Sequence, residues 1–364
     1  NALMTDLKND GSWIATYTET GAPQGSGTIA ATAGTGIGSA DTALLTLGGF
    51  GISGTACGLH ALGNSEVFLL GTGSEKITAS AGSAALLETA AAQRVTIKNY
   101  TTQALGAVSA AVKVTDGTVT LDGGKILGST SVEAVAINAD ASANPSVTLK
   151  GALEVKAGVQ PGTRSTGTVT VTGADSSHKA LLFIQDAAKI MGDGCQSGVM
   201  INQYADVAMT GGAVAKNPDA DEAINVPIYG VWLTDPTATF ALSAGSLVGG
   251  TDALFQEAGS VWISGGSLDT KISGVNEPVV YTTGSMWVTG GTINGVLVGD
   301  SSTTAKLYIN PAAAEPVYLS GQFASVTGKA TQQNNDLTIG NTTDAANMLD
   351  VQGNYANGTA TPAN

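Results

Sequence analysis

The sequence predicts an all-β chain wound as a right-handed parallel β-helix, a β-solenoid of roughly twelve or more coils, on three observations. Short apolar runs alternate with a period of two, which is typical of strands. Turns rich in glycine follow these runs at recurring intervals. Small residues dominate, because 49 of the 364 residues are glycine, 43% are hydrophobic and only 5% are aromatic. Small side chains of this kind suit the narrow interior of a coil.

The repeat is clearest in residues 261–268 and 286–293, which both read apolar, aromatic, apolar, hydroxyl, Gly, Gly, hydroxyl, apolar. Looser copies begin at Val95, Val119, Val147, Val169, Val207, Phe240 and Val317. The turns between positions 48 and 321 lie on average about 25 residues apart, which is in the range of solenoid repeats. The Gly-Gly pair supplies the positive φ that a sharp corner requires.

A second, shorter alternating strand lies between these copies, and it is seen at residues 134–137, 181–184, 279–281 and 296–298. We therefore expect two or three short strands in each coil. Each strand would pair in parallel with its counterpart one coil away, at about 4.8 Å, and the inward Val, Ile and Leu side chains would form columns. An antiparallel sandwich is the alternative, and the long period disfavours it.

The chain divides into three parts in this interpretation. Residues 1–40 form an N-terminal cap or the first coils, residues 41–355 the β-helix, and residues 356–364 a tail. The chain begins with Asn1 rather than Met, which suggests a piece of a longer precursor. Neither end carries a clear amphipathic cap, so either the caps lie in other segments of the precursor or another copy provides them. In the second case we expect copies to assemble head-to-tail, or by donor-strand exchange, into a fibre or lattice.

The charge of the chain restricts its partners. The net charge is −14, and the 15 lysines and arginines are scattered along the chain, so nucleic acid is not an expected partner. No run of about 18 apolar residues is present, so we expect no membrane insertion. These features predict a soluble, acidic, secreted protein of the cell exterior.

Few residues suit catalysis. His60 and His178 would lie several coils apart, so they cannot share a metal ion or act as a dyad. Cys57 and Cys195 would lie about 25 Å apart, far beyond the reach of a disulfide, and we expect buried thiols, with an intermolecular bridge as the alternative. No zinc, serine-hydrolase or phosphate-loop motif occurs.

The carboxylates offer two weak candidates. Asp219, Asp221 and Glu222 form the densest acidic cluster, which could bind Ca²⁺, although a solvated insertion loop is the favoured interpretation. Asp186 and Asp193 flank a short segment and would serve as the acids of a polysaccharide hydrolase or lyase, but nothing pairs them. We therefore expect no catalytic residues and no cofactor, with Ca²⁺ as the alternative.

The aromatic residues offer a binding surface. If Trp262, Trp287 and Tyr318 point outward, they form a ladder on which sugar rings could stack. Trp262 stands between the apolar residues Val261 and Ile263, which favours the outward orientation. Inward, core-filling rings and a ladder that only stabilises the sheet are the alternatives.

The copies at residues 262–268 and 287–293 resemble the repeats of secreted bacterial right-handed parallel β-helix surface proteins: adhesins, autotransporter passengers and relatives of the pectate-lyase-like superfamily. The resemblance covers about residues 40–355 and implies an architecture rather than an activity. The polygalacturonase motifs of that superfamily are missing. We therefore expect a non-enzymatic extracellular structural or adhesive protein whose partners are copies of itself or surface glycans. A carbohydrate-active enzyme, or a phage or secretion-system spike, is the alternative.

Overall fold

The computed structural model describes the chain in segments. Side chains are described for residues 51–55, 57–61, 66–80, 94–106, 110–129, 133–158, 167–192, 197–218, 226–271, 278–299 and 305–308. Only the strand backbone is described for residues 27–30, 35–39, 44–48, 50, 62, 87–90, 309, 317–323, 325–327 and 330–339.

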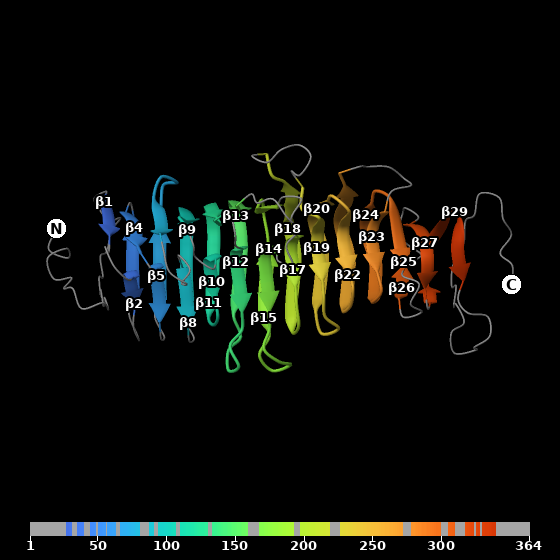
Figure 1. Ribbon diagram of the computed structural model, residues 1–364, viewed down its shortest axis with the longest axis horizontal. Coiled ribbons are helices and arrows are strands. Elements are labelled where there is room, and N and C mark those ends of the chain that lie inside the picture. The colour runs from blue at the N-terminus through green and yellow to red at the C-terminus, as the bar shows by residue number, and fades with distance from the viewer. Residues whose placement is uncertain are drawn as a thin grey trace.

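The described strands form two sheets of parallel strands, and in each sheet the strands follow one another along the long axis of the molecule (Figure 1). Sheet A has 16 strands, in the order β1 (Gly27–Ala30), β4 (Phe50–Gly54), β7 (Lys76–Ala79), β9 (Arg94–Ala104), β11 (Thr118–Leu127), β13 (Ser146–Lys156), β15 (Ala180–Ile184), β18 (Ala205–Lys216), β20 (Thr239–Gly249), β22 (Ser260–Thr270), β24 (Ser285–Ile293), β26 (Lys306–Ile309) and β28 (Ser325–Thr327), with β3 (Leu44–Gly48), β6 (Glu66–Leu70) and β16 (Lys189–Gly192) beside this path.

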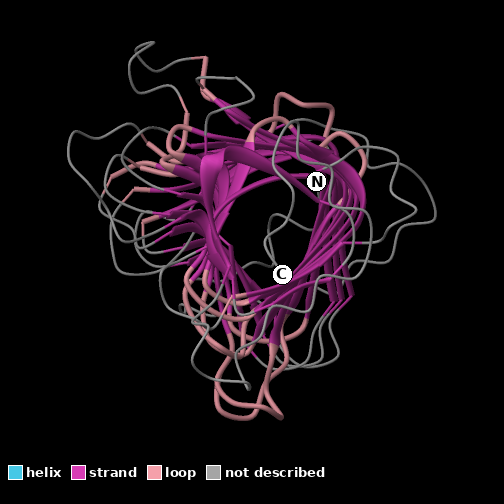
Figure 2. Cartoon of the chain, turned by 90° about the vertical axis from the view of Figure 1, so that its right-hand side faces the viewer, coloured by secondary structure: helices cyan, strands magenta, loops and turns pink. Residues whose placement is uncertain are grey.

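Sheet B has 13 strands, in the order β2 (Thr35–Ser39), β5 (Cys57–Leu62), β8 (Leu87–Ala90), β10 (Ala110–Val114), β12 (Glu133–Asn138), β14 (Gly167–Thr172), β17 (Ser197–Ile201), β19 (Tyr229–Leu233), β21 (Asp252–Gln256), β23 (Pro278–Thr282), β25 (Val296–Gly299), β27 (Val317–Phe323) and β29 (Ala330–Ile339). The chain passes from one sheet to the other and back, and neighbouring strands pair in parallel, for example β22 with β24 and β21 with β23. Seen along the axis, the strands surround a central core (Figure 2).

The molecule is therefore an all-β parallel β-solenoid, as predicted. No helix occurs in the described residues, so the described part of the chain contains no membrane-spanning helix. The strands β1 and β2 lie within the predicted N-terminal segment and pair with β4 and β5. The predicted tail, residues 356–364, lies outside the described residues.

Columns of inward aliphatic side chains fill the core. Neighbouring strands place like residues in register, and every member of one column of sheet A between β9 and β26 is buried: Val95, Val119, Val147, Leu182, Val207, Phe240, Val261, Met286 and Leu307. Burying one such side chain stabilises the fold by about 1.5–3 kcal/mol. The period-two alternation thus sets which residues enter the core.

Residues with positive φ gather at one corner of the coil. They are Asn99, Gly123, Gly124, Gly151, Asp186, Gly212, Gly245, Gly266 and Gly291. Asn99 and Asp186 are the two non-glycine members, and Asn and Asp are the residue types that adopt this conformation most readily. The predicted positive φ at the Gly-Gly pairs is confirmed.

The assignment of some repeat copies was wrong. The copies that begin at Val169 and Val317 belong to β14 and β27 of sheet B, whereas residues 181–184 form β15 of sheet A. The two sheets share the same alternation of inward aliphatic and outward polar residues, so the alternation alone does not distinguish them. The copies that do contain hydroxyl-Gly-Gly, on β18, β22 and β24, all lie in sheet A, but other sheet A copies lack it, so this signal identifies only some strands.

Candidate functional site

Three aromatic rings form a ladder on the outer face of sheet A. Trp262 of β22 pairs in register with Trp287 of β24, and Trp287 pairs with Tyr308 of β26. Trp262 stands in sequence between the fully buried Val261 and Ile263, and it is itself 41% exposed. Trp287 and Tyr308 are half-buried. The two tryptophans thus point outward, the orientation that their apolar neighbours favoured.

The rings of this ladder stack face to face. The ring centroids of Trp262 and Trp287 are 5.0 Å apart with an interplanar angle of 7°, and those of Trp287 and Tyr308 are 5.2 Å apart at 6°. The spacing follows from the parallel sheet, because adjacent strands lie about 4.8 Å apart and hold one ring each. Trp287 therefore has an aromatic ring on both of its faces and presents its edge to solvent.

Tyr318 does not belong to this ladder. It lies on β27 of sheet B, where it pairs with Val296, and its side chain is outside the described residues. Tyr308 takes the third place, a residue that the sequence analysis missed. The segment Lys306–Ile309 has the apolar-aromatic-apolar alternation of the tryptophan copies but lacks their Gly-Gly pair, which is why the repeat search passed over it.

On the other side of Trp262, the same register column holds two alanines. Trp262 pairs with Ala241 of β20, Ala241 pairs with Ala208 of β18, and Ala208 pairs with Phe183 of β15. An alanine side chain ends at Cβ and cannot cover an indole ring. The face of Trp262 that points toward Ala241 is therefore not covered by a ring of the column, which agrees with its greater exposure.

Hydroxyl groups line both sides of the ladder. One flanking column contains Thr239, Ser260 and Ser285 and continues to Lys306 beside Tyr308, and the other contains Ser243, Ser264 and Thr289. The Ser243 hydroxyl donates to the Met209 carbonyl at 3.5 Å, and the Ser264 hydroxyl donates to the Leu242 carbonyl at 3.4 Å. These bonds reach the preceding coil close to the corner, where the register of the backbone ladder shifts. The hydroxyl of the repeat thus supports the corner.

A charged pair adjoins the alanine positions. The Thr239 hydroxyl donates to Oδ1 of Asp206 at 2.6 Å, and Nζ of Lys179 donates to Oδ2 at 3.0 Å. Asp206 precedes Ala208 by two residues on β18, so its side chain points to the same outer face. The carboxylate therefore has a charged partner on one side and a hydroxyl on the other.

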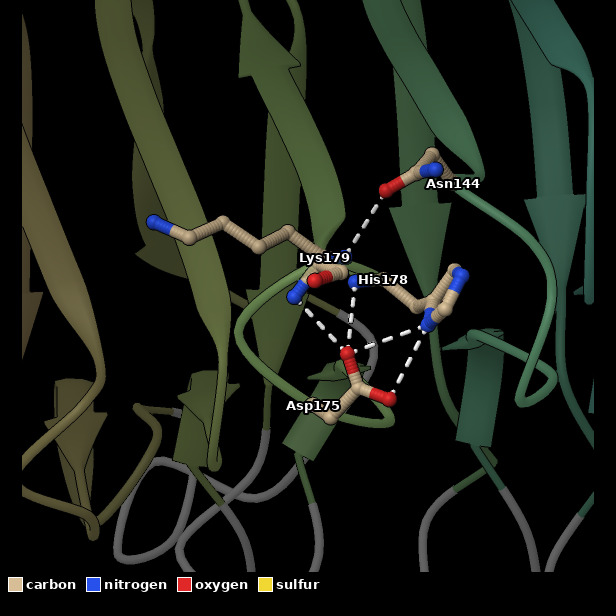
Figure 3. Close-up of polar contacts among 5 residues, drawn as sticks. Asn144, Asp175, His178 and Lys179 are labelled. Carbon is tan, nitrogen blue, oxygen red and sulfur yellow. Dashed lines mark hydrogen bonds and ion pairs between the residues drawn. The ribbon is translucent and has the colours of Figure 1, made fainter.

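The loop before β15 holds Lys179 in place (Figure 3). Its backbone N–H donates to Oδ1 of Asn144 at 2.9 Å, which ties it to the preceding coil. Within the loop, Nδ1 of His178 lies 2.9 Å from Oδ2 of Asp175, and Oδ1 of Asp175 accepts the backbone N–H groups of Ser177 and His178. The hydrogen bond from His178, followed by that of the Ser177 N–H, lowers the pKa of Asp175. These contacts give His178 a structural role, remote from His60 on β5.

A second aromatic group lies on sheet B at the same level of the coil. Trp232, Phe255 and Tyr281 share one outward register column, and Tyr229 stacks on Phe255 with a centroid distance of 4.3 Å. The rings within the column are tilted, for example by 52° between Trp232 and Phe255. All four rings are half-buried, so this group offers less open surface than Trp262.

A buried carboxyl lies beside this group. Asp252 pairs in register with Tyr229 and is only 5% exposed. Burial raises the pKa of Asp252 to about 6. Burial also raises the pKa of Tyr229, with smaller contributions from the charges of Asp252 and Glu257. The sequence analysis did not single out Asp252. The apolar residues that follow it in β21 (Asp252–Gln256) were the one sequence feature that could have indicated a buried position.

The acidic candidates do not assemble into a described site. Asp219, Asp221, Glu222, Asp193 and Cys195 lie outside the described residues. In the part of the chain that is described, no three His, Cys, Asp or Glu side chains could together hold a metal ion.

The remaining candidates have structural surroundings. Asp186 occupies the corner column with a φ of 56° and accepts the Gly151 N–H at 3.2 Å, so its carboxylate stabilises the corner. Cys57 is buried, and its thiol donates to the Leu59 carbonyl at 3.0 Å.

No protein-family model matches the chain, and no curated protein and no solved structure matches it either. The parallel β-solenoid that the family resemblance implied is present, and the family itself remains a proposal.

Proposed function

We propose that this chain is a non-enzymatic, extracellular adhesive β-solenoid that binds neutral glycans on the outer face of sheet A between β20 and β26. The observation that carries the proposal is the exposed ring of Trp262, at the end of a stacked ladder and bordered by hydroxyl groups. An aromatic face packs against the C–H groups of a sugar ring, and flanking hydroxyls bond its O–H groups.

The charge distribution supports a neutral ligand. The strands β20, β22 and β24 contain a single charged residue, Asp269, and β26 adds Lys306, while the rest of their outer face is mainly hydroxyl, small and aromatic. The net charge of −14 opposes the approach of an acidic polysaccharide. Neutral sugars meet no such barrier.

The family resemblance supports the remaining parts of this proposal. Secreted β-helix surface proteins imply a right-handed coil, a cell-surface location and no resident cofactor, and the long strand order of each sheet supports twelve or more coils. Neither Ca²⁺ nor a catalytic acid is part of the proposal.

Self-assembly is a second candidate function, and the open strand order favours it. The order of sheet A ends in β1 and β28, that of sheet B ends in β2 and β29, and each of these four strands has one neighbouring strand in the described part of its sheet. Such ends are able to pair with another copy, head-to-tail. Light scattering that grows with protein concentration is the expected result, and particles that stay monomeric at millimolar concentration would remove this candidate.

Binding to a polysaccharide panel tests the glycan proposal. We expect wild-type protein to be retained by one or more insoluble neutral polysaccharides, and the triple variant Trp262→Ala, Trp287→Ala, Tyr308→Ala to be released. The matched control is Phe68→Ala, because Phe68 is a 40% exposed aromatic residue on the same outer face, far along the coil. A triple variant that binds as wild type does, or a wild-type protein that releases reducing sugar with turnover, would overturn the proposal.

A further inference from the structure

We propose that the ligand site lies at one end of the ladder, where a single neutral pyranose ring stacks on the face of Trp262 that points toward Ala241. This inference rests on the proposed glycan binding and states where the sugar binds, how many rings stack there and what sugar chemistry the site selects.

The inner faces of the ladder are not accessible to a ligand. Trp262 and Trp287 stack at 5.0 Å, and Trp287 and Tyr308 stack at 5.2 Å, with their planes within 7° of parallel. A sugar ring stacked between two of these rings would require them to separate by about one further ring thickness. The hydrogen-bonded pairing of the strands beneath them opposes that separation. A sugar chain laid along the ladder would meet ring edges, not the faces that attract C–H groups.

The two alanines leave room next to Trp262. Phe183 and Trp262 occupy the same column three strands apart, with Ala208 and Ala241 on the strands between them. At about 4.8 Å for each strand, the column has two empty places in a span of about 14 Å. A ring stacked on Trp262 needs about 4.5–5 Å, which the place above Ala241 supplies. Trp262 is also the most exposed of the three ladder rings.

The polar groups around the empty places require a ligand that donates hydrogen bonds. Thr239 and Ser243 flank Ala241 on β20, and their hydroxyl hydrogens are already donated to Asp206 and to the Met209 carbonyl. Their free lone pairs can only accept. Asp206 also accepts, and Lys179 donates one of its three N–H groups to it, so the two charges largely offset each other. Sugar hydroxyls satisfy the acceptors on Thr239, Ser243 and Asp206, whereas the carboxylate of an acidic sugar has no hydrogen to donate to them.

Filling the two empty places tests the inference. The double variant Ala208→Trp, Ala241→Trp would extend the ladder from Phe183 to Tyr308 and leave no open face on Trp262. We expect its affinity for the best neutral hexasaccharide among cellohexaose, mannohexaose and laminarihexaose to fall at least tenfold by calorimetry. The matched control Ala208→Ser, Ala241→Ser adds no ring and should bind within threefold of wild type.

Two further variants locate the ligand. Trp262→Ala uncovers the face of Trp287, so binding should persist in weakened form instead of disappearing. Phe68→Ala removes an exposed ring that lies outside the ladder and should leave affinity unchanged. If the double tryptophan variant does not melt cooperatively, Ala241→Tyr places one ring on Trp262 and reports on the same face.

The outcomes separate the inference from the proposed function. If the triple ladder variant loses binding while the folded double tryptophan variant keeps it, the end-face site is wrong and glycan binding stands. If the triple variant retains wild-type binding, the proposed function itself is wrong. Tighter binding of hexagalacturonic acid than of all three neutral hexasaccharides would overturn the assigned sugar chemistry.

Discussion

Two regions of sheet A share one backbone plan but carry different outer surfaces. Among residues with described side chains, the outer column runs from Phe68 on β6 through threonines on β9, β11 and β13, then through Phe183 and two alanines, to the aromatic rings on β22, β24 and β26. Its members are Phe68, Thr96, Thr120, Thr148, Phe183, Ala208, Ala241, Trp262, Trp287 and Tyr308. The inward columns beneath both regions are apolar and buried, and aliphatic at most positions. The inner residues thus determine the coil, and the outer residues are free to differ from region to region.

The flanking columns differ in the same way. In the threonine region, Asp122 lies between two lysines of the adjacent coils, with its Oδ2 3.8 Å from Nζ of Lys98 and 3.8 Å from Nζ of Lys150. In the aromatic region, hydroxyl groups occupy the flanks. Each position sits about 4.8 Å from its equivalent in the next coil, so like charges would repel there. Side chains of neighbouring coils therefore attract one another in both regions, through opposite charges in one and through stacked rings in the other.

The corner glycines give the largest expected contrast between the regions. A Cβ at Gly124 would lie 2.1 Å from the Tyr100 carbonyl oxygen, whereas one at Gly266 would lie 2.8 Å from the Gly245 oxygen, and both residues have positive φ. We expect Gly124→Ala to lower the free energy of unfolding by about 3 kcal/mol or more and Gly266→Ala by about 1–2 kcal/mol. Urea unfolding measures both. Gly73→Ala is the control, because its φ is positive but no atom lies within 4 Å. Equal losses at all three sites would show that backbone strain alone matters.

The ladder itself should stabilise its region. Trp287→Ala removes two stacked ring contacts, each of about 0.5–1.5 kcal/mol, and should lower the free energy of unfolding by about 1–3 kcal/mol in all. Thr120→Ala, at the equivalent position of the other region, should change it by about 0.5 kcal/mol or less. Thermal unfolding of both variants measures the difference. A Trp287→Ala variant as stable as wild type would mean that stacking contributes nothing to the fold.

The buried Asp252 should make stability depend on pH. Its pKa is raised from 3.8 to about 6, so between about pH 4 and 6 the folded chain keeps a proton that the unfolded chain has lost. Its contribution to stability is present below pH 4 and is lost as pH rises through 6. At pH 8, the free energy of unfolding of Asp252→Asn should therefore be about 2 kcal/mol higher than that of wild type, since water still screens part of the full effect. At pH 3.5 the two free energies of unfolding should be equal. A gain of the same size at both pH values would rule out titration of Asp252 as the cause.

The features that recur in every coil could be predicted from the sequence, whereas those that occur once could not. The core columns follow from alternation, and the corner follows from Gly-Gly, because burial and positive φ each require particular residue types. Which sheet a strand joins is a matter of chain order over a whole coil, so the copies at Val169 and Val317 were misplaced. Tyr308 and Asp252 became apparent only when register placed them beside Trp287 and Tyr229. The two alanines of the site, Ala208 and Ala241, could not be predicted as site residues, because they matter only through the register that places them beside Trp262.

The charged column of the threonine region gives the smallest expected effect. Asp122→Asn removes one charge from between Lys98 and Lys150, whose side chains are 46% and 36% exposed. Exposed ion pairs contribute about 0–1 kcal/mol, so we expect the free energy of unfolding to fall by about 0.5 kcal/mol at low salt. In 1 M NaCl the screening length shortens to about 3 Å, and the difference from wild type should disappear. The effect of Trp287→Ala should persist there, because ring stacking involves no net charge. Chemical unfolding in urea at both salt concentrations measures the two variants side by side. A salt-independent loss in Asp122→Asn would mean that the carboxylate acts through packing at the corner instead of through its charge.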